Sequence, residues 1–594
     1  MKGLTRLFTA VALVALSSLP AGGQSPTNNP TASLLIDLIR LNTSNPPGNE
    51  RQLAELLAPR FRALGFDVKV IETPDTAKAM IIARLKGDGS KRPVLIAAHA
   101  DVVGVERDKW SVDPFAGLVK DEHVYGRGAI DFKGGMAVFA RAAMMLAEQK
   151  VPLARDVIFI AESDEESGGP YGTAWLAREH WSDIDAEFAL NEGGWIMKGD
   201  DGHVRYVSIS TADKMSIPMT VTARGTSTHS SMPRPDNAIF SLARALAKLS
   251  AYETPLSITP DTKQFFMALS RTSAPPTSGY FRDLVGSDPA RARRADAIVG
   301  RDPLLHSLVR NTIAPVIIQG GFRNNVIPGS ASAMVNLRLI PGSDLNAFLA
   351  TLRKVVGDST VEMQAKAPAY AQAAPSSENT DLYRALVAAA HAQFPGAEVT
   401  PYLFQAGTDA AAWRSRGVPV YGIYPYPIDA DELTRMHGND EKVSIASLEQ
   451  GTAMIFKTLV EVAGKKQPGA TVRSGRVRMR SAGPRSFSRE WTSPISAMRF
   501  TRASRTGARD PVRGSGRGER HSEREPVARD REYRSRRTVG RRRDHRPLAE
   551  SAAHVGRRRP RAHRWRHGRD GRVRANRVAD RLPSDRCCAA DRRN

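Results

Sequence analysis

Short apolar runs alternate with amphipathic segments along the first third of the chain. Strands are predicted for the runs "DVKVIE", "AMIIARLKG", "PVLIAAHAD", "DVIFIAES" and "EFALNEGG", whose length and composition fit buried strands. Helices are predicted for "ASLLIDLIRL", "NERQLAELLAPRFRALG", residues 134–150 and "GTAWLAREH", where apolar residues recur at helical spacing. Because alternating strands and helices build parallel sheets, residues 30–212 predict a layered α/β domain with a largely parallel central sheet.

The pattern changes near residue 213. Half-exposed strands are predicted for "KMSIPMTVTARG" and "SASAMVNLRLIPG", and amphipathic helices for "NAIFSLARALAKLSAY" and "DLNAFLATLRKVVG". This set predicts a smaller α+β sandwich over residues 213–368, interrupted at about 254–311 by an insertion with weak helical patches. Residues 369–466 return to the first pattern, so the α/β domain is predicted to be discontinuous.

The first residues have the pattern of an export signal. Residues 1–23 place Lys2 and Arg6 before a short apolar core, and the small residues Ala21 and Gly23 precede a plausible cleavage position. The apolar core is about ten residues long, whereas a membrane span needs about 20. We therefore expect an exported protein, periplasmic or secreted, without a membrane anchor.

The net charge of +24 lies entirely in residues 467–594. This segment contains 37 Arg, 13 acidic residues and no Lys, so the rest of the chain is neutral. One interpretation is an arm that binds a polyanion, in which case the remainder could be a catalytically inactive body. The segment lacks interleaved aromatic residues and helical periodicity, which favours a disordered extension or a sequence translated out of frame. No nucleic-acid partner is expected.

Carboxylate and imidazole side chains follow several of the predicted strands, where open α/β sheets bind ligands. The residues are His99, Asp101, Asp131, Glu165, Glu166, Glu192 and His437. Three adjacent carboxylates occur in "IAESDEESGG", and two unit charges about 4 Å apart repel by about 4 kcal/mol at an effective dielectric near 20. Either water screens these charges or a cation lies opposite them.

Each of these motifs also has an ordinary explanation. Asp131 is well placed to cap the helix that follows it, a run of charges is usually a solvated loop, and Glu192 and His437 could lie at surface turns. Taken together, two His and three carboxylates form a ligand set suited to zinc. The only cysteines are Cys587 and Cys588, so a metal in the body must be held by such N and O ligands.

The motifs "HADVV", "GRGAIDFKGG", "DEESGG" and "RMHGNDEKV" resemble those of the dinuclear zinc peptidases and deacylases. This family includes aminoacylase, acetylornithine deacetylase, succinyl-diaminopimelate desuccinylase, glutamate carboxypeptidase and carboxypeptidase S, and the resemblance covers about residues 30–465. It implies that His99 and Glu192 hold one zinc, that Glu166 and His437 hold the other, and that Asp131 bridges the two. It also implies a cis peptide bond after Asp131.

The resemblance implies hydrolysis of an amide or peptide bond by a metal-bound hydroxide. Zinc lowers the pKa of bound water from about 15.7 to about 7, and Glu165 would act as the general base that completes the deprotonation. Asp101 would orient His99, since the two side chains share one face of an extended segment. The expected cofactors are two Zn²⁺ ions, with Co²⁺ or Mn²⁺ as alternatives.

The predicted smaller domain adds further candidates by resemblance. His229 in "GTSTHSSMP" would stabilise the oxyanion, often across a dimer interface, so a homodimer through this lid domain is expected. The substrate contacts implied are Asn325, Arg338, Gly407 and Thr408. For Arg338, a solvent-facing strand residue is an equal alternative.

The expected substrate is a small molecule, either an N-acyl amino acid or a short peptide with a C-terminal residue. Many relatives carry an Arg where this chain has Ala411, so the substrate carboxylate would need Arg414 or Arg338 instead. The long insertion resembles that of the carboxypeptidase S and N-acyl-amino-acid hydrolase branch. This branch points toward N-acyl amino acids or dipeptides with apolar side chains.

Overall fold

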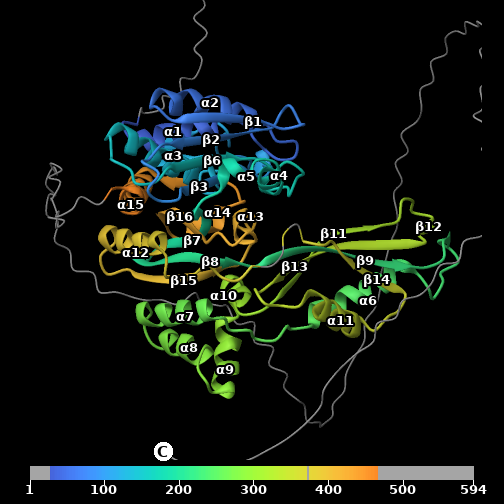
Figure 1. Ribbon diagram of the computed structural model, residues 1–594. Coiled ribbons are helices and arrows are strands. Elements are labelled where there is room, and N and C mark those ends of the chain that lie inside the picture. Colours follow the sequence, from blue (N-terminus) through green and yellow to red (C-terminus); the bar gives the residue numbers. More distant parts are fainter. Residues whose placement is uncertain (1–26, 369, 371–372, 466–594) are drawn as a thin grey trace, which may run out of the picture. The chain divides into compact units, whose positions relative to one another are not determined.

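A computed structural model of the protein describes residues 27–368, 370 and 373–465. Its largest element is an eight-stranded sheet with the order β1-β2-β6-β3-β7-β16-β8-β15 (Figure 1). The strands are β1 (Asp67–Glu72), β2 (Ala79–Leu85), β3 (Val94–His99), β6 (Val157–Glu162), β7 (Phe188–Lys198), β8 (Val204–Asp213), β15 (Glu398–Phe404) and β16 (Val420–Ile428). The β3–β6, β3–β7, β7–β16 and β8–β15 pairs are parallel, which confirms the predicted fold class.

The strands β3, β6 and β16 of this sheet are buried on both faces. In β6, Phe159 packs into one hydrophobic core, whereas the neighbouring Ile158 and Ile160 pack into another. Because successive side chains point to opposite faces of a sheet, helices must cover both sides. The first core is covered by α1 (Pro30–Ile39), α2 (Arg51–Ala63), α3 (Lys133–Glu148), α12 (Asp381–Gln393) and α15 (Ile445–Ala463), and the second by α4 (Thr173–Glu179), α5 (Trp181–Ile184) and α13 (Ala410–Arg414).

Shorter elements connect this framework. A three-stranded sheet has the order β17-β5-β4. The elements are η1 (Arg107–Lys109), β4 (Leu118–Lys120), β5 (His123–Tyr125), α14 (Ala430–Arg435) and β17 (Lys442–Ser444). β5 precedes the loop that carries Asp131, and α14 and β17 lie on either side of the loop that carries His437.

A second, four-stranded antiparallel sheet has the order β11-β13-β9-β14. Its strands are β9 (Met215–Arg224), β11 (Thr312–Gly320), β13 (Ser330–Leu339) and β14 (Val361–Ala365), and it is accompanied by α6 (Ala238–Ala251) and α11 (Leu345–Val356) and by the small pair β10 (Thr228–His229) and β12 (Val326–Ile327). Ile217, Met219 and Val221 of β9 form a core with the two helices. This is the α+β sandwich that the alternating pattern predicts.

The insertion predicted at about 254–311 consists of helices. These are α7 (Pro260–Thr272), α8 (Thr277–Leu284), α9 (Pro289–Val299) and α10 (Pro303–Leu308). Phe265 and Phe266 of α7 belong to the core of the eight-stranded sheet, and the rings of Phe265 and Tyr402 in β15 are 4.9 Å apart. The insertion therefore packs against the larger sheet although the strands before and after it belong to the smaller one.

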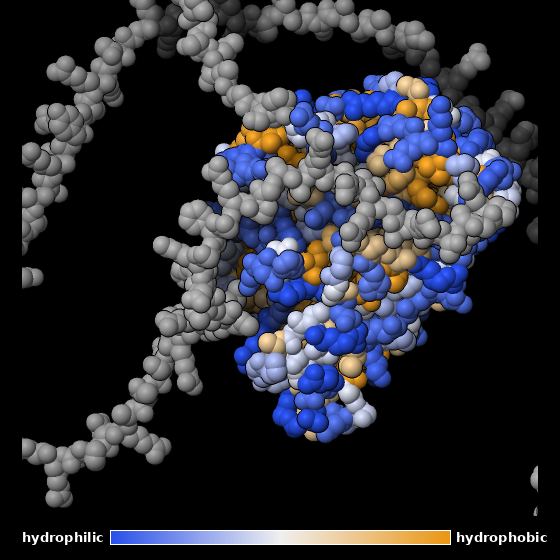
Figure 2. Space-filling model, turned by 90° about the vertical axis from the view of Figure 1, so that its left-hand side faces the viewer, coloured by the Kyte–Doolittle hydropathy of each residue, from blue (hydrophilic) through white to orange (hydrophobic). Residues whose placement is uncertain are grey.

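Large hydrophobic side chains are exposed mainly around β11. Val316, Ile317, Ile318 and Phe322 are 52–75% exposed, and Phe240 of α6 is 61% exposed. On the face shown in Figure 2, hydrophobic areas are separated by hydrophilic ones. No helix in the described part of the chain has the length and apolar character needed to cross a bilayer. The predicted export signal and the Arg-rich tail lie outside the described residues.

Candidate active site

The residues predicted to bind metal come from five separate segments around the eight-stranded sheet. His99 is the last residue of β3, Glu166 follows β6, and Glu192 lies in β7 beside β3. Asp131 precedes α3, and His437 follows α14. Because the carboxyl ends of parallel strands meet at one edge of a sheet, residues far apart in the chain converge there.

These five side chains form two groups that share one member. In the first group, potential ligand atoms of His99, Asp131 and Glu192 lie within 4.8 Å of one another, and in the second the same holds for Asp131, Glu166 and His437. Asp131 belongs to both groups. The structure thus brings together all five residues in the pairing that the resemblance implies.

The Asp131 carboxylate lies between the two imidazoles. Its Oδ1 is 3.2 Å from Nε2 of His99, and its Oδ2 is 2.9 Å from Nε2 of His437. The remaining partners are at similar distances, with 3.5 Å from His99 Nε2 to Glu192 Oε2 and 3.2 Å from His437 Nε2 to Glu166 Oε1. Each Asp131 oxygen therefore faces a different ligand group, which is the arrangement a bridging carboxylate requires.

The charges at this site fit bound cations. Burial raises the pKa of Glu192 to about 7, and burial together with the charge of Glu192 raises the pKa of Glu165 well above its ordinary value. Burial alone would also raise the pKa of Asp131, but hydrogen bonds with His437 and His99 lower it instead. A divalent cation would stabilise the charged form of these crowded carboxylates, and imidazole nitrogens with carboxylate oxygens are ligands that zinc accepts.

A buried glutamate positions the loop that carries Asp131. Glu441 is fully buried, and its Oε1 accepts hydrogen bonds from the backbone N–H groups of Ile130, at 2.6 Å, and Asp131, at 3.0 Å. Arg127 donates to Oε2 of Glu441 at 2.5 Å, which balances the charge. The motifs "GRGAID" and "NDEKV" therefore meet through this ion pair.

The glycines after Asp131 are required by close packing. The Asp131–Phe132 peptide is cis, as the resemblance implies, and the Phe132 ring lies over the start of α3. A Cβ atom on Gly135 would lie 2.2 Å from this ring, and a Cβ on Gly134 would lie 2.1 Å from the carbonyl oxygen of Ala129. Only glycine fits at either position, which explains the "KGG" of the motif.

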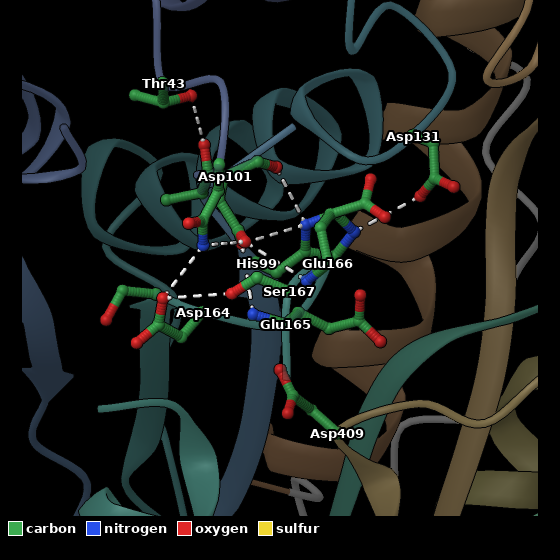
Figure 3. A network of polar contacts seen from close by, with 12 residues as sticks. Thr43, His99, Asp101, Asp131, Asp164, Glu165, Glu166, Ser167 and Asp409 are labelled. Carbon is green, nitrogen blue, oxygen red and sulfur yellow. Dashed lines mark hydrogen bonds and ion pairs between the residues drawn. The ribbon is translucent and has the colours of Figure 1, made fainter. Parts of the chain in front are cut away.

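Asp101 holds the turn that presents Glu165 and Glu166. Its Oδ1 accepts from the N–H of Glu165 at 3.2 Å, and its Oδ2 accepts from the N–H of Glu166 at 3.1 Å (Figure 3). Nδ1 of His99 is 3.0 Å from the backbone carbonyl oxygen of Asp101 but 3.6 Å from its carboxylate. The imidazole is therefore nearest the carbonyl of Asp101, and the carboxylate, 3.6 Å from the imidazole, also binds the turn.

Tyr424 of β16 is a site residue that sequence reasoning did not identify. Its hydroxyl oxygen is 3.0 Å from Asp131 Oδ1 and 3.0 Å from Glu192 Oε2, so one group contacts two of the candidate ligands. Stacking on Trp195, with ring centroids 4.4 Å apart, fixes the Tyr424 ring. No local signal marks this tyrosine in the apolar run "VYGIYPYPI".

A cavity of about 790 Å³ opens onto the candidate ligands. Glu165 lines it, as do Gly407 and Thr408, and Arg338 of β13 reaches it from the smaller sheet. Burial lowers the pKa of Arg338 although the charge of Glu165 raises it. Among the described residues the guanidinium of Arg338 has no ion-pair or hydrogen-bond partner, so it is free to bind an anionic group.

The guanidinium of Arg414 is already paired within the protein. Its Nη1 is 2.6 Å from Oδ2 of Asp213, and its Nη2 donates to the carbonyl of Val420 at 2.9 Å. Ala411 lines the cavity, but the Arg414 guanidinium is held by these partners and is buried. Of the two substitutes considered from the sequence, Arg338 is therefore the one with a free guanidinium.

His229 and Asn325 lie outside this cavity. His229 is paired with Val326 in the β10–β12 pair, Asn325 directly precedes Val326 and accepts at its carbonyl from the N–H of Ser230 at 2.9 Å, and both His229 and Asn325 are exposed. The structure therefore brings these two predicted residues together with each other but not with the candidate ligands of the same chain.

Comparison with known proteins identifies the family. The profile of peptidase family M20/M25/M40 matches residues 95–461, which is more than half of the chain and contains all five candidate ligands. The chain belongs to this family. It is therefore a hydrolytic enzyme of a metal-dependent peptidase family, and its reaction is the hydrolysis of peptide or N-acyl amino acid bonds.

Curated M20 relatives cover most of the described residues. "Probable carboxypeptidase S-like 2" from Dictyostelium discoideum is 29% identical over 384 residues, which is 63% of this chain and 72% of that protein. The human "N-fatty-acyl-amino acid synthase/hydrolase PM20D1" is 28% identical over 388 residues, or 64% of this chain and 76% of the relative.

Solved structures share the fold. The M20 family metallo-carboxypeptidase Sso-CP2 from Sulfolobus solfataricus superposes with a TM-score of 0.56 at 17% identity, covering 73% of this chain and 99% of that one. Human carnosine dipeptidase 1 gives a TM-score of 0.54 at 19% identity, covering 73% and 95% of the two chains. The combination of a large, largely parallel sheet with a separate antiparallel sheet is therefore common to these proteins.

Proposed function

We propose that this M20 enzyme hydrolyses the amide bond of N-acyl amino acids, or of short peptides with a C-terminal residue, using two divalent cations. Zn²⁺ suits the ligands best, with Co²⁺ or Mn²⁺ as alternatives. His99, Asp131 and Glu192 would hold one cation, and Asp131, Glu166 and His437 the other. The observation that carries the proposal is the Asp131 carboxylate, whose two oxygens face different imidazoles at 3.2 and 2.9 Å.

Cations bound there would polarise the substrate carbonyl and lower the pKa of a water molecule. The protein's own contribution is a positioned proton acceptor. Glu165 lines the cavity beside the candidate ligands, and Asp101 fixes its backbone through the hydrogen bond at 3.2 Å. The Glu165 carboxylate would accept the proton of the attacking water and return it to the leaving amine.

Arg338 supports a substrate with a free carboxylate. Its side chain lines the cavity and is half-buried, where a charge without a partner is unfavourable. A planar guanidinium pairs with both oxygens of a carboxylate, so a C-terminal or amino acid carboxylate satisfies it. Apolar residues, among them Met215, Pro341 and Phe404, line other parts of the cavity and suit an apolar acyl group or side chain.

A substrate panel tests this proposal. The enzyme is expected to hydrolyse N-acyl amino acids that have a free carboxylate, and to hydrolyse the matching amino acid amides with a much higher KM. Replacing Arg338 by Met should raise KM for the free acids by about 10- to 100-fold, because one charge-assisted contact contributes about 1.5–3 kcal/mol. The KM for the amides should change little.

The matched control is Arg293→Met, since Arg293 is exposed on α9. Steady-state kinetics on acid and amide pairs gives each KM separately. If the purified enzyme with added Zn²⁺ or Co²⁺ hydrolyses none of the acids, the proposed function is wrong. If R338M raises KM equally for acids and amides, the role of Arg338 is wrong.

We also propose that two copies associate through the smaller sheet. β11 is an edge strand of that sheet, and its exposed apolar side chains lie next to α6. An exposed apolar edge strand favours pairing with another chain. His229 and Asn325 are exposed in the β10–β12 pair of the same part of the chain, so association would provide a route by which His229 acts in a neighbouring cavity.

Replacing Ile318 by Lys is expected to convert dimers into monomers. Ile318 is 67% exposed on β11, and a lysine there would place a charge in the apolar contact. Ile298→Lys is the matched control, because Ile298 is 37% exposed on α9. Sedimentation velocity should show dimers for the wild type and I298K and monomers for I318K. A wild type that sediments as a monomer would contradict this proposal.

A further inference from the structure

A buried ion pair supports the turn that carries Glu165. The turn follows β6 and begins at Asp164, whose φ is 64°. This left-handed conformation is uncommon for residues other than glycine, so contacts with the rest of the protein must hold it. Nζ of Lys78 contacts Oδ1 of Asp164, and the two side chains are only 7% and 0% exposed. Oδ2 of Asp164 accepts from the N–H of Tyr171 at 3.0 Å.

Asn45 connects this ion pair to Asp101. Its Nδ2 donates to Asp164 Oδ1 at 2.8 Å and to Asp101 Oδ2 at 2.8 Å, and its Oδ1 accepts from Nζ of Lys78 at 3.4 Å. The Asp101 carboxylate also accepts hydrogen bonds from the backbone N–H groups of Glu165 and Glu166 in the turn. The side-chain amide of Asn45 therefore joins the two carboxylates that hold the turn. Asp164 is the first residue of the turn, and Asp101 binds the backbone of the next two, Glu165 and Glu166.

The charges of this cluster depend on Lys78. Asp101, Asp164 and Glu50 are all buried, and the Lys78 ammonium is the cation in contact with Asp164. Burial raises the pKa of Glu50 to about 7. Without the ammonium, the two carboxylates joined by Asn45 would have no cation beside them, and their repulsion would be stronger in this poorly solvated place.

We propose that Lys78 and Asn45 are positioning residues for amide hydrolysis, because they hold Asp164 and Asp101 together and so fix the turn that aims Glu165 into the cavity. The inference rests on the proposed function of this site. Neither Lys78 nor Asn45 lines the cavity, so neither contacts a substrate bound there. Asn45 lies in the segment "NPPGNE", and Lys78 directly precedes β2. The proposed mechanism gives neither segment another role.

The double variant K78M/D164N tests the proposal. It removes both partners of the Lys78–Asp164 pair, so neither partner is left as an unpaired charge, and it also removes the ionic contact that fixes the turn. We expect kcat to fall by about 10- to 100-fold, as misplacement of a catalytic group by about 1 Å does, while KM stays within about twofold. Since Glu166 belongs to the same turn, the affinity for Co²⁺ in a calorimetric titration should fall by about 10-fold.

The matched control is R84M/D156N. Arg84 is near the opposite end of β2, and its Nη1 is 3.0 Å from Oδ2 of Asp156. Both side chains are partly buried, at 16% and 15% exposure. This control should keep the wild-type kcat and Co²⁺ affinity even where its melting temperature falls. A loss of kcat that is equal in the two double variants would show that Lys78 acts through stability alone.

Two outcomes overturn the inference, namely wild-type kcat and Co²⁺ affinity in K78M/D164N, or equal losses in the control. Should K78M/D164N not fold, as judged by circular dichroism, Asn45→Ala takes its place with the same expected losses and the same contrary result. If the wild type hydrolyses no substrate, the proposed function fails. The Co²⁺ titrations of the variants then decide the positioning role by themselves.

Discussion

Replacing Glu165 by Gln is expected to lower kcat by about 10²- to 10⁴-fold, the range over which a positioned general base contributes. Gln has nearly the same size as Glu, and its backbone N–H can still donate a hydrogen bond to Asp101. Its side-chain amide, however, cannot take a proton from water. Burial and the charge of Glu192 raise the pKa of Glu165 above its ordinary value.

The measurement is kcat and KM for an N-acyl amino acid, together with the cation content of the purified variant. Cation content should be unchanged, because Glu165 is not among the candidate ligands. Glu179→Gln is the matched control, since Glu179 is an exposed residue of α4. An E165Q variant with the kcat of the wild type would remove Glu165 from the mechanism.

Replacing Asp131 by Ala is expected to abolish activity by releasing both cations. Asp131 is the one residue common to the two candidate ligand groups, so its loss removes a ligand from each. Loss of a residue that only supports a ligand lowers cation affinity by about 10- to 100-fold. The loss of cation affinity in D131A should be larger, because a direct ligand is removed. His437→Ala removes a ligand from the second group alone, and one tightly bound cation should remain.

Cation stoichiometry, measured by elemental analysis of dialysed protein, separates these cases. The expected order is two per chain for the wild type, one for H437A and none for D131A. Asp201→Asn changes an exposed carboxylate and serves as the control, with two cations expected. Retention of two cations by D131A would show that Asp131 does not bridge.

The sequence predicted the convergence of the five candidate ligands because each lies in a motif beside a recognisable strand or helix. His99 ends a continuous apolar run, and Glu166 lies in the turn after another. In a largely parallel sheet such ends meet at one edge, so the pattern of hydrophobic positions was enough to predict their convergence. The family resemblance implied the pairing of these residues into two groups, whereas the distances around Asp131 required the three-dimensional structure.

Other site residues left no local signal. Tyr424 lies within an apolar strand, where a tyrosine is ordinarily a core residue, and its hydroxyl contacts Glu192 of β7, the strand with which β16 pairs. Lys78 and Asn45 are polar residues in short connections, and such residues are usually exposed. Their burial follows from contacts with Asp164, which is far away in the sequence.

The helical insertion was predicted poorly for a different reason. Its apolar residues complete a core that is built mainly by strands elsewhere in the chain, so its own periodicity is weak. A usable signal was nonetheless present at the helix starts. Thr259, Asp288 and Asp302 each accept hydrogen bonds from backbone N–H groups of the following turn, and each precedes a proline at the first helical position.

Diffraction data recorded at the zinc absorption edge from crystals grown with Zn²⁺ test the central claim most directly. The account predicts two anomalous peaks on either side of the Asp131 carboxylate, one bound by His99 and Glu192 and the other by Glu166 and His437. A single peak, or two peaks that do not share Asp131, would contradict it.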